Sequence, residues 1–156
     1  MQTSFTDKQL LDKDNKTSET IIRKCVHCGM CNATCPTYGI NGEELEGPRG
    51  RIYLIKDMLE NKKPATKEIA KHIDSCLSCY SCMTTCPSGV NYMHLIDHGR
   101  NYVEETYKRP FLDRLFRNIL SFVLPRPKIF LLMAWASKIV KPFSFCLLYT
   151  SPSPRD

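Results

Sequence analysis

Apolar residues recur three or four positions apart along much of the 156-residue chain, which is the spacing of one face of an α-helix. In one such segment, Pro48 stands near the predicted helix start, and Ile52, Ile55 and Leu59 follow on one face. Proline suits the first helical turn because its missing N–H needs no partner there. No segment shows the strict alternation that is typical of a half-buried strand. The pattern therefore predicts an all-α protein.

Capping residues predict two shorter helices, each directly before a cysteine-rich run. Ser18 is predicted to be the N-cap of the first helix, which carries Ile21 and Ile22. Thr66 is predicted to be the N-cap of the second, over the sequence "KEIAKHIDS". A helix is thus expected to lead into each run.

Two further helices are predicted after the second run. The first extends up to Arg109 and shows its pattern at Leu95, Tyr102, Val103 and Thr106. The second spans residues 111–124, with an apolar stripe at Leu112, Leu115, Phe116, Ile119 and Val123. Both patterns are interpreted as packing surfaces. The sequence "PRP" ends the second helix, because proline lacks the N–H that helix continuation requires.

These elements predict four regions along the chain. Residues 1–17 form an N-terminal segment, 18–109 the cysteine-rich domain, and 110–145 helices and a linker that open a further region. The last eleven residues, "CLLYTSPSPRD" at 146–156, resemble the translation of a sequencing adapter, and the native sequence is expected to stop at Phe145. The alternative is a disordered Pro/Ser-rich tail with a free thiol. In either case Cys146 is not expected to be a ligand.

The cysteine-rich run occurs twice. "CVHCGMCNATCPT" begins at Cys25 and "CLSCYSCMTTCPS" begins at Cys76, so each cysteine of the first run has a counterpart 51 positions later. Both runs read C-x2-C-x2-C-x3-C-P. Repetition in register at every cysteine predicts two copies of one structural unit.

This spacing is typical of [4Fe-4S] clusters. Cysteines at i, i+3 and i+6 can reach three irons of one cluster, and in two-cluster ferredoxins the fourth cysteine, before proline, ligates the other cluster. The predicted ligands of one cluster are Cys25, Cys28, Cys31 and Cys86. Those of the other are Cys76, Cys79, Cys82 and Cys35. The alternatives are structural zinc, which is usually held by two separate C-x2-C pairs, and a thiol-redox role.

Several neighbouring residues could act on the clusters. Gly29 leaves space where backbone amides approach cluster sulfur. His27 could tune a cluster by hydrogen bonding, or could be a solvated loop residue. Arg49 and Arg51 could neutralise cluster charge, or could be exposed arginines at a helix start. The remaining histidines, His72, His94 and His98, have no ligand partner that the sequence identifies.

Composition changes this interpretation only slightly. The chain start lacks the basic and apolar regions of a secretory signal, so a reducing cytoplasm is expected and disulfides are disfavoured. The formal charge of +6 suggests an acidic partner. Two clusters with their eight thiolates would reduce it to about +2, so no nucleic-acid partner is expected. The longest apolar run, at 129–136, is too short to predict a transmembrane segment.

Three stretches of the chain resemble the iron–sulfur subunit of bacterial glycolate oxidase. They are the sequence from Cys25 through "GINGEELEGPRGRIYLIKDMLE", the second run with "GVNYMHLIDHGRNYVEE", and "RPFLDRLFRNILSFVLPRP". The resemblance extends over most of residues 1–145. It implies a helical two-cluster ferredoxin domain like those of succinate dehydrogenase and heterodisulfide reductase subunits. Family members continue into two repeats with a Cys-Cys-Gly signature, which this sequence does not contain.

The resemblance also implies a function. The chain would relay electrons from FAD-containing subunits that oxidise glycolate to glyoxylate, towards a membrane quinone or another acceptor. No catalytic residue is expected in this chain, because it has no dinucleotide-binding loop and clusters exchange single electrons. A cytoplasmic location, or a peripheral one on the inner face of the membrane, is expected. The alternatives are the equivalent subunits for lactate or anaerobic glycerol 3-phosphate oxidation and, in another class, a zinc-stabilised interaction module.

Overall fold

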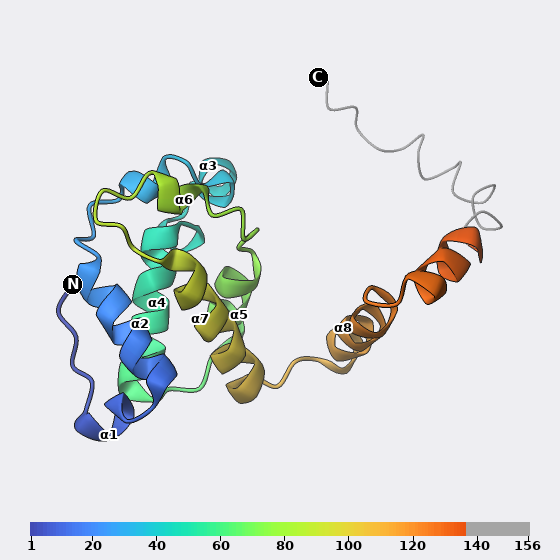
Figure 1. Cartoon of the computed structure of the whole chain (residues 1–156), viewed down its shortest axis with the longest axis horizontal. Helices are drawn as coiled ribbons and strands as arrows, with labels where there is room; N and C mark the ends of the chain where they lie inside the picture. The colour runs from blue at the N-terminus through green and yellow to red at the C-terminus, as the bar shows by residue number, and fades with distance from the viewer. Residues whose placement is uncertain (137–156) are drawn as a thin grey trace. The chain divides into compact units, whose positions relative to one another are not determined.

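The structure is a computed structural model, and it describes residues 1–136 (Figure 1). The predicted tail at 146–156, with Cys146, lies outside these residues. Residues 1–136 form helices and no strand, which confirms the all-α prediction. The elements are α1 (Asp7–Leu10), α2 (Lys13–Lys24), η1 (Met30–Asn32), α3 (Pro36–Asn41), η2 (Glu44–Glu46), α4 (Pro48–Asn61), α5 (Lys67–Asp74), α6 (Ser81–Thr84), α7 (Tyr92–Thr106) and α8 (Phe111–Val123).

The chain divides into two compact units, Met1–Lys108 and a second unit that begins at Arg109. The first unit contains α1 to α7 and both cysteine-rich runs, whereas the second begins with α8. The amino-terminal segment belongs to the first unit and packs on α4: Gln9 is buried, and its side-chain amide donates to the carbonyl oxygens of Leu59 and Glu60, both at 2.9 Å.

Helices α4 and α7 pack against each other, with α2 and α5 beside them (Figure 1). Their contact is close because Gly99 of α7 has no side chain: a Cβ atom there would lie 2.8 Å from the Cδ1 atom of Ile55 on α4. The residues predicted for the face of α4 are buried, with Ile55 fully inaccessible and Ile52 and Leu59 nearly so. Burying this face supplies much of the driving force for folding.

Two of the predicted helix starts are confirmed. Pro48 occupies the first turn of α4, directly after Gly47. Thr66 is the N-cap of α5, where its hydroxyl accepts a hydrogen bond from the backbone N–H of Ile69 at 3.3 Å. Each residue satisfies or avoids a backbone donor that would otherwise lack a partner at the helix end.

The predicted N-cap at Ser18 is wrong. Helix α2 begins at Lys13, and its N-cap is Asp12, whose carboxylate accepts from the backbone N–H of Asp14. Ser18 lies inside the helix, fully buried, and its hydroxyl is 2.6 Å from Nδ1 of His98 on α7. The first turns of α2 are polar, so apolar periodicity could not reveal them.

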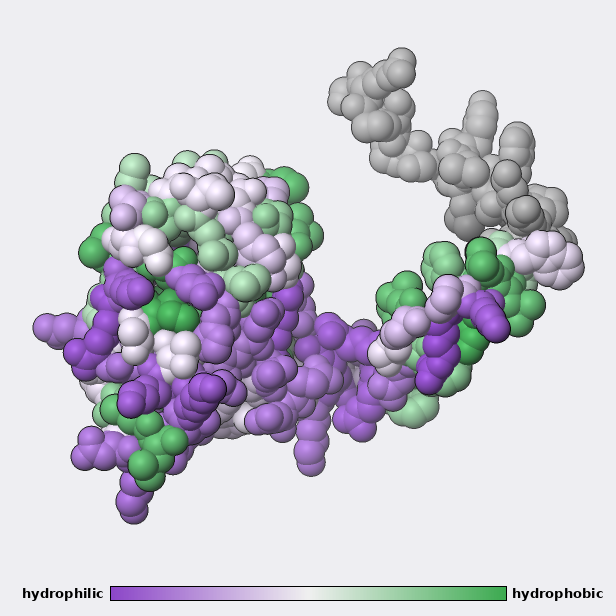
Figure 2. Space-filling view, viewed as in Figure 1, coloured by the Kyte–Doolittle hydropathy of each residue, from purple (hydrophilic) through white to green (hydrophobic). Residues whose placement is uncertain are grey.

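Helix α8 has the predicted length but its stripe is not buried. Apart from the half-buried Val123, the apolar residues of the helix are exposed; Phe116, for example, has 64% of its surface accessible. Figure 2 shows the apolar surface that gathers on this segment. Within residues 1–136, no single helix has the length and apolarity to cross a membrane. Only α8 taken together with Pro127–Ala136, across a bend of 115°, meets that criterion.

Candidate metal centres

The two cysteine-rich runs share an unusual backbone conformation. His27 and Gly29 in the first run have positive φ angles of 60° and 81°. Their counterparts 51 positions later, Ser78 and Tyr80, have φ angles of 51° and 57°. Left-handed conformations are uncommon for residues other than glycine, so their recurrence shows that both runs form the same turn.

The runs lie beside each other at one end of the helices, near α3 and α6 (Figure 1). Helix α6 of the second run contacts η1 of the first. The repeated threonines also meet, since the Thr85 hydroxyl donates to the Thr34 hydroxyl at 3.3 Å. The two halves of the repeat are therefore packed against each other rather than separated along the chain.

Two cavities lie between the runs. The first cavity is lined by three cysteines of the first run and the last cysteine of the second: Cys25, Cys28, Cys31 and Cys86. The second cavity is lined by three cysteines of the second run and the last cysteine of the first: Cys76, Cys79, Cys82 and Cys35. Cys82 borders both cavities. The structure thus brings all eight predicted site residues to these two cavities, and all eight are free thiols.

The thiols of these cavities are suited to a cationic metal core. Burial and the neighbouring thiol of Cys25 raise the pKa of Cys31 to about 11. Burial and the neighbouring Cys31 raise the pKa of Cys82 to about 12. Crowded, buried thiols resist ionisation because each thiolate repels the next, and bound iron would offset that repulsion by coordinating them as thiolates. The donor set therefore fits [4Fe-4S] clusters.

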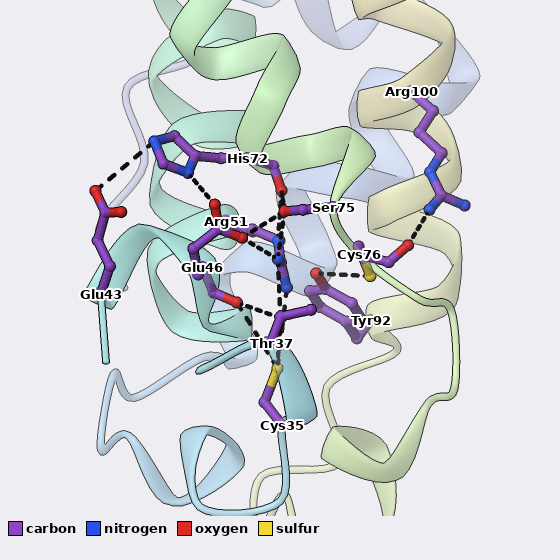
Figure 3. Close-up of polar contacts among 10 residues, drawn as sticks. All are labelled: Cys35, Thr37, Glu43, Glu46, Arg51, His72, Ser75, Cys76, Tyr92 and Arg100. Atoms are coloured by element: carbon purple, nitrogen blue, oxygen red, sulfur yellow. Dashed lines mark hydrogen bonds and ion pairs between the residues drawn. The ribbon is translucent and has the colours of Figure 1, made fainter. Parts of the chain in front are cut away.

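A buried polar network lies beside the second cavity (Figure 3). Arg51, with 1% of its side chain exposed, pairs with Glu46 at 2.9 Å and donates to the backbone carbonyl of His72 at 2.7 Å. The exposed alternative for Arg51 is therefore wrong. Ser75 and His72 also bond Glu46. Burial acts to raise the pKa of Glu46, but hydrogen bonds from Ser75 and His72 and the charge of Arg51 hold it below its usual value.

The network reaches the sulfur of Cys35. Nη1 of Arg51 donates to Cys35 Sγ at 3.9 Å, and Nη2 donates to the Thr37 hydroxyl at 3.0 Å. The Thr37 hydroxyl in turn donates to the Glu46 carbonyl oxygen at 2.7 Å. The last cysteine of the first run is thereby fixed to the second cavity by groups from α3, η2 and α4.

Tyr92 and Arg100 of α7 bind the start of the second run (Figure 3). The buried hydroxyl of Tyr92 donates to Cys76 Sγ at 3.7 Å, and burial raises the pKa of this phenol well above its usual value. Arg100 donates to the Cys76 carbonyl oxygen at 2.6 Å and to the Ser78 hydroxyl at 2.7 Å. Sequence reasoning missed both residues, because contacts over 16 and 24 positions leave no local spacing signal.

A different pair lies beside the first cavity. Arg49 lines this cavity and forms an ion pair with Glu44, in which 32% and 43% of the two side chains are exposed. Nη1 of Arg49 also donates to the His27 carbonyl oxygen at 3.4 Å. The hydrogen bond from Arg49 lowers the pKa of Glu44. The imidazole of His27 lies 6.4 Å from the Tyr53 ring, measured between ring centroids, and the residue is exposed.

Outside the cysteines, Glu43, Glu46 and His72 could group around a cation within residues 1–136. Both carboxylate oxygens of Glu46 already accept hydrogen bonds, one from His72 at 2.8 Å and the other from Arg51 at 2.9 Å. Glu46 is therefore already bound by protein groups, one of them the cationic guanidinium of Arg51. We therefore interpret this group as a structural ion-pair network.

Comparison with known proteins gives a consistent result. Residues 21–90 match the family model described as the 4Fe-4S dicluster domain. The chain is 47% identical over 143 residues to the glycolate oxidase iron-sulfur subunit of Escherichia coli strain K12, covering 92% of the chain and 35% of that relative. It is 31% identical over 117 residues to the probable glycolate oxidase iron-sulfur subunit of Bacillus subtilis strain 168, covering 72% and 26%.

More distant relatives match a shorter part of the chain. The succinate dehydrogenase iron-sulfur subunit of Paracoccus denitrificans is 30% identical over 74 residues, which is 44% of the chain and 29% of that relative. The chain spans only about a third of the E. coli relative and about a quarter of the B. subtilis one. No solved structure matches the chain.

Proposed function

We propose that the protein relays electrons within a glycolate-oxidising complex, because residues 21–90 match the 4Fe-4S dicluster domain and most of the chain is similar to glycolate oxidase iron–sulfur subunits. The dicluster match and the cysteine content support two [4Fe-4S] clusters as its cofactors. A flavin-containing partner would oxidise glycolate to glyoxylate, and this chain would accept the electrons.

The grouping of cysteines around the two cavities carries the proposal. Each cavity combines the first three cysteines of one run with the last cysteine of the other. That is the crossed arrangement expected of two-cluster ferredoxins. In our assignment, Cys25, Cys28, Cys31 and Cys86 hold the first cluster, and Cys76, Cys79, Cys82 and Cys35 hold the second.

The chain's own residues supply binding and electrostatics. A bound iron–sulfur cluster accepts and donates single electrons. The cysteine runs supply the thiolates, and the left-handed residues at positions 27, 29, 78 and 80 turn the backbone around each site. Arg51 and Arg49 place positive charge beside the second and first cavities, which offsets the negative charge of the thiolate ligands.

Metal content is the first test. Chain purified without oxygen, or reconstituted with iron and sulfide, should be brown and contain close to eight irons and eight acid-labile sulfides per molecule, as two cubane clusters require. A variant with serine at both Cys28 and Cys79 should lose most of this iron, whereas Cys146→Ser should retain it. A colourless product with stoichiometric zinc would contradict electron relay and favour a zinc-stabilised interaction module.

Substrate and partner form the second test. Co-expressed with the flavin-containing subunits of a bacterial glycolate oxidase, the chain should co-purify with them, and the assembly should reduce an artificial acceptor when glycolate is added. Loss of reduction in the Cys28/Cys79 double serine variant would show that electrons pass through this chain. Activity with lactate alone, or with glycerol 3-phosphate alone, would contradict glycolate as the substrate and move the chain to the corresponding related complex.

We also propose a peripheral association with the inner face of the membrane, where a quinone could be the acceptor. Helix α8 supports this, because it presents exposed Phe111, Leu112 and Phe116 together with basic residues such as Arg114. An exposed amphipathic helix with aromatic and basic residues suits an anionic lipid surface.

Vesicle flotation tests this association. The chain should float with vesicles that contain phosphatidylglycerol, and less with vesicles of phosphatidylcholine alone. Phe116→Glu should abolish flotation, whereas Leu11→Glu, which changes an exposed leucine of the first unit, should not. Equal flotation of the two variants would contradict a lipid-binding role for α8.

A further inference from the structure

The two cavities differ in the side chains that face their cysteine sulfurs. In the second cavity, the Tyr92 hydroxyl donates to Cys76 Sγ at 3.7 Å and the Arg51 guanidinium donates to Cys35 Sγ at 3.9 Å (Figure 3). Both donors are almost fully buried, with 3% and 1% of their surface exposed. Two ligands of one site therefore meet a fixed phenol and a fixed guanidinium, which is ion-paired with Glu46 at 2.9 Å. Cys35 Sγ also lies 3.7 Å from a backbone acceptor, the Glu46 carbonyl oxygen.

In the first cavity, the side chain that faces a cysteine sulfur is an acceptor rather than a donor. Oδ1 of Asn32 lies 3.9 Å from Cys31 Sγ. The orientation of this amide is set by its other end, since Nδ2 donates to both carboxylate oxygens of Glu44 at 3.3 and 3.1 Å. The backbone N–H of Arg49 also reaches Oδ1, at 3.5 Å. An oxygen acceptor cannot donate a hydrogen bond to a thiolate.

These contacts have opposite effects on the reduced state. Reduction adds negative charge to a cluster and its thiolates, so hydrogen-bond donors and positive charge next to sulfur stabilise the reduced form and raise the reduction potential. The effect is strong where the donors are buried, because water does not screen them. Arg49 could act similarly at the first cavity, but its side chain is partly exposed, and its hydrogen bonds go to Glu44 and to the His27 carbonyl oxygen rather than to a cysteine sulfur.

We propose that Tyr92 and Arg51 are tuning residues that give the cluster of the second cavity a higher reduction potential than the cluster of the first. This inference rests on the proposed electron-relay function. An electron delivered to the chain then settles at the second cavity, and transfer from the first cavity to the second is favourable. Electron transfer within the chain therefore has a preferred direction, from the first cavity to the second.

The test is a redox titration of the anaerobically prepared, iron-loaded chain, followed by electron paramagnetic resonance. Two reduction steps are expected at separate potentials. Cys28→Ser, which alters only the first cavity, should remove or change the step at lower potential. Loss of the higher step instead, or two steps at one potential, would overturn the proposal. This outcome does not depend on any variant of Tyr92 or Arg51.

Tyr92→Phe identifies the donor. It keeps the ring and removes only the hydroxyl, so the higher step should shift to lower potential while the lower step stays in place. The matched control is Tyr102→Phe, whose hydroxyl donates to the Lys63 carbonyl oxygen at 3.1 Å, and it should move neither step. A shift of the lower step, or no shift at all, would contradict the role of Tyr92.

The result also separates this inference from the proposed function. A chain that contains no iron and sulfide contradicts electron relay itself. A chain with two clusters of equal potential contradicts only the asymmetry between the cavities. Iron and sulfide are therefore quantified in every variant before the titration is compared.

Discussion

Two glutamate–arginine pairs, Glu44 with Arg49 and Glu46 with Arg51, have the same sequence separation but opposite environments. The first is partly exposed beside the first cavity, and the second is almost completely buried beside the second cavity. Spacing alone therefore does not predict what such a pair contributes. Burial decides it, because exposed ion pairs contribute little, whereas breaking a buried pair strands a charge away from water.

Helix geometry explains the divergence. Arg49 and Arg51 lie two positions apart in α4, and successive residues turn by about 100°, so the two side chains leave the helix about 200° apart. One guanidinium reaches the first cavity and the other reaches the second. A single helix start thereby serves both candidate centres with residues of the same chemistry but different exposure.

Of the variants that distinguish the two cavities, replacement of the last cysteine of a run should have the largest effect. In the crossed assignment, Cys35→Ser should damage the cluster of the second cavity and Cys86→Ser that of the first, each by loss of one ligand. Conversion of the affected cluster to a three-iron form would be visible by electron paramagnetic resonance. If each run bound its own cluster independently, the two variants would exchange their effects.

Double variants show which of the two clusters each cysteine substitution damages. Cys28→Ser disrupts the first cavity, so its combination with Cys86→Ser should harm one site and leave about half of the iron. Its combination with Cys35→Ser should harm both sites. Iron and sulfide analysis distinguishes these outcomes, and the reverse result would exclude crossed ligands even in a protein that retains iron–sulfur chemistry.

The second-largest effect is expected at the buried pair. Arg51→Met should lower the free energy of unfolding by about 3 to 5 kcal/mol, because Glu46 would remain buried without its cation. The midpoint of anaerobic urea unfolding, compared at equal iron content, measures this loss. Adding Glu46→Gln to Arg51→Met should recover part of the stability. A double variant no more stable than Arg51→Met alone would contradict the stranded charge as the cause.

Local signals in the sequence predicted much of the fold. Pro48 and Thr66 marked helix starts because each acts on the few residues beside it. The repeat identified eight candidate ligands through spacing, and their assignment to particular clusters remains a prediction for the cysteine variants. The N-cap at Asp12 was missed, and Ser18 was wrongly predicted in its place, because the polar first turns of α2 carry no apolar period. The buried Ser18 hydroxyl instead contacts His98, 80 positions away.

Surroundings of the candidate centres could not be predicted in the same way. Tyr92 lies in α7 but binds Cys76 of the second run, and Ser75 follows α5 but binds Glu46 of η2. No spacing rule connects residues of such different elements. The apolar stripe of α8 shows a second limit of sequence patterns, which predict an element but not its surroundings. Periodicity correctly predicted the helix, but it could not state what covers the stripe, and the apolar face of α8 is exposed.

A smaller effect is expected at the repeated turn. Gly29→Ala should lower the free energy of unfolding by about 1 kcal/mol, because φ is 81° there and alanine is strained in the left-handed region. The new Cβ would also lie 2.8 Å from Nη1 of Arg49, which can move aside. Gly29→Asn should cost less than Gly29→Val, since asparagine tolerates this conformation. Equal urea midpoints for the asparagine and valine variants would contradict this explanation.

The smallest effect is expected at the exposed pair. Arg49→Met should change the free energy of unfolding by no more than about 1 kcal/mol, because water screens the charges of Arg49 and Glu44 and either side chain can be resolvated when its partner is lost. Added salt should reduce even this difference, since exposed charges are screened over about 10 Å at 0.1 M. Urea midpoints of Arg49→Met and Arg51→Met, measured together at low and high salt, compare the two pairs directly. Similar losses in both variants would mean that the Arg49 pair is desolvated when the clusters are bound, and that the two cavities are electrostatically alike.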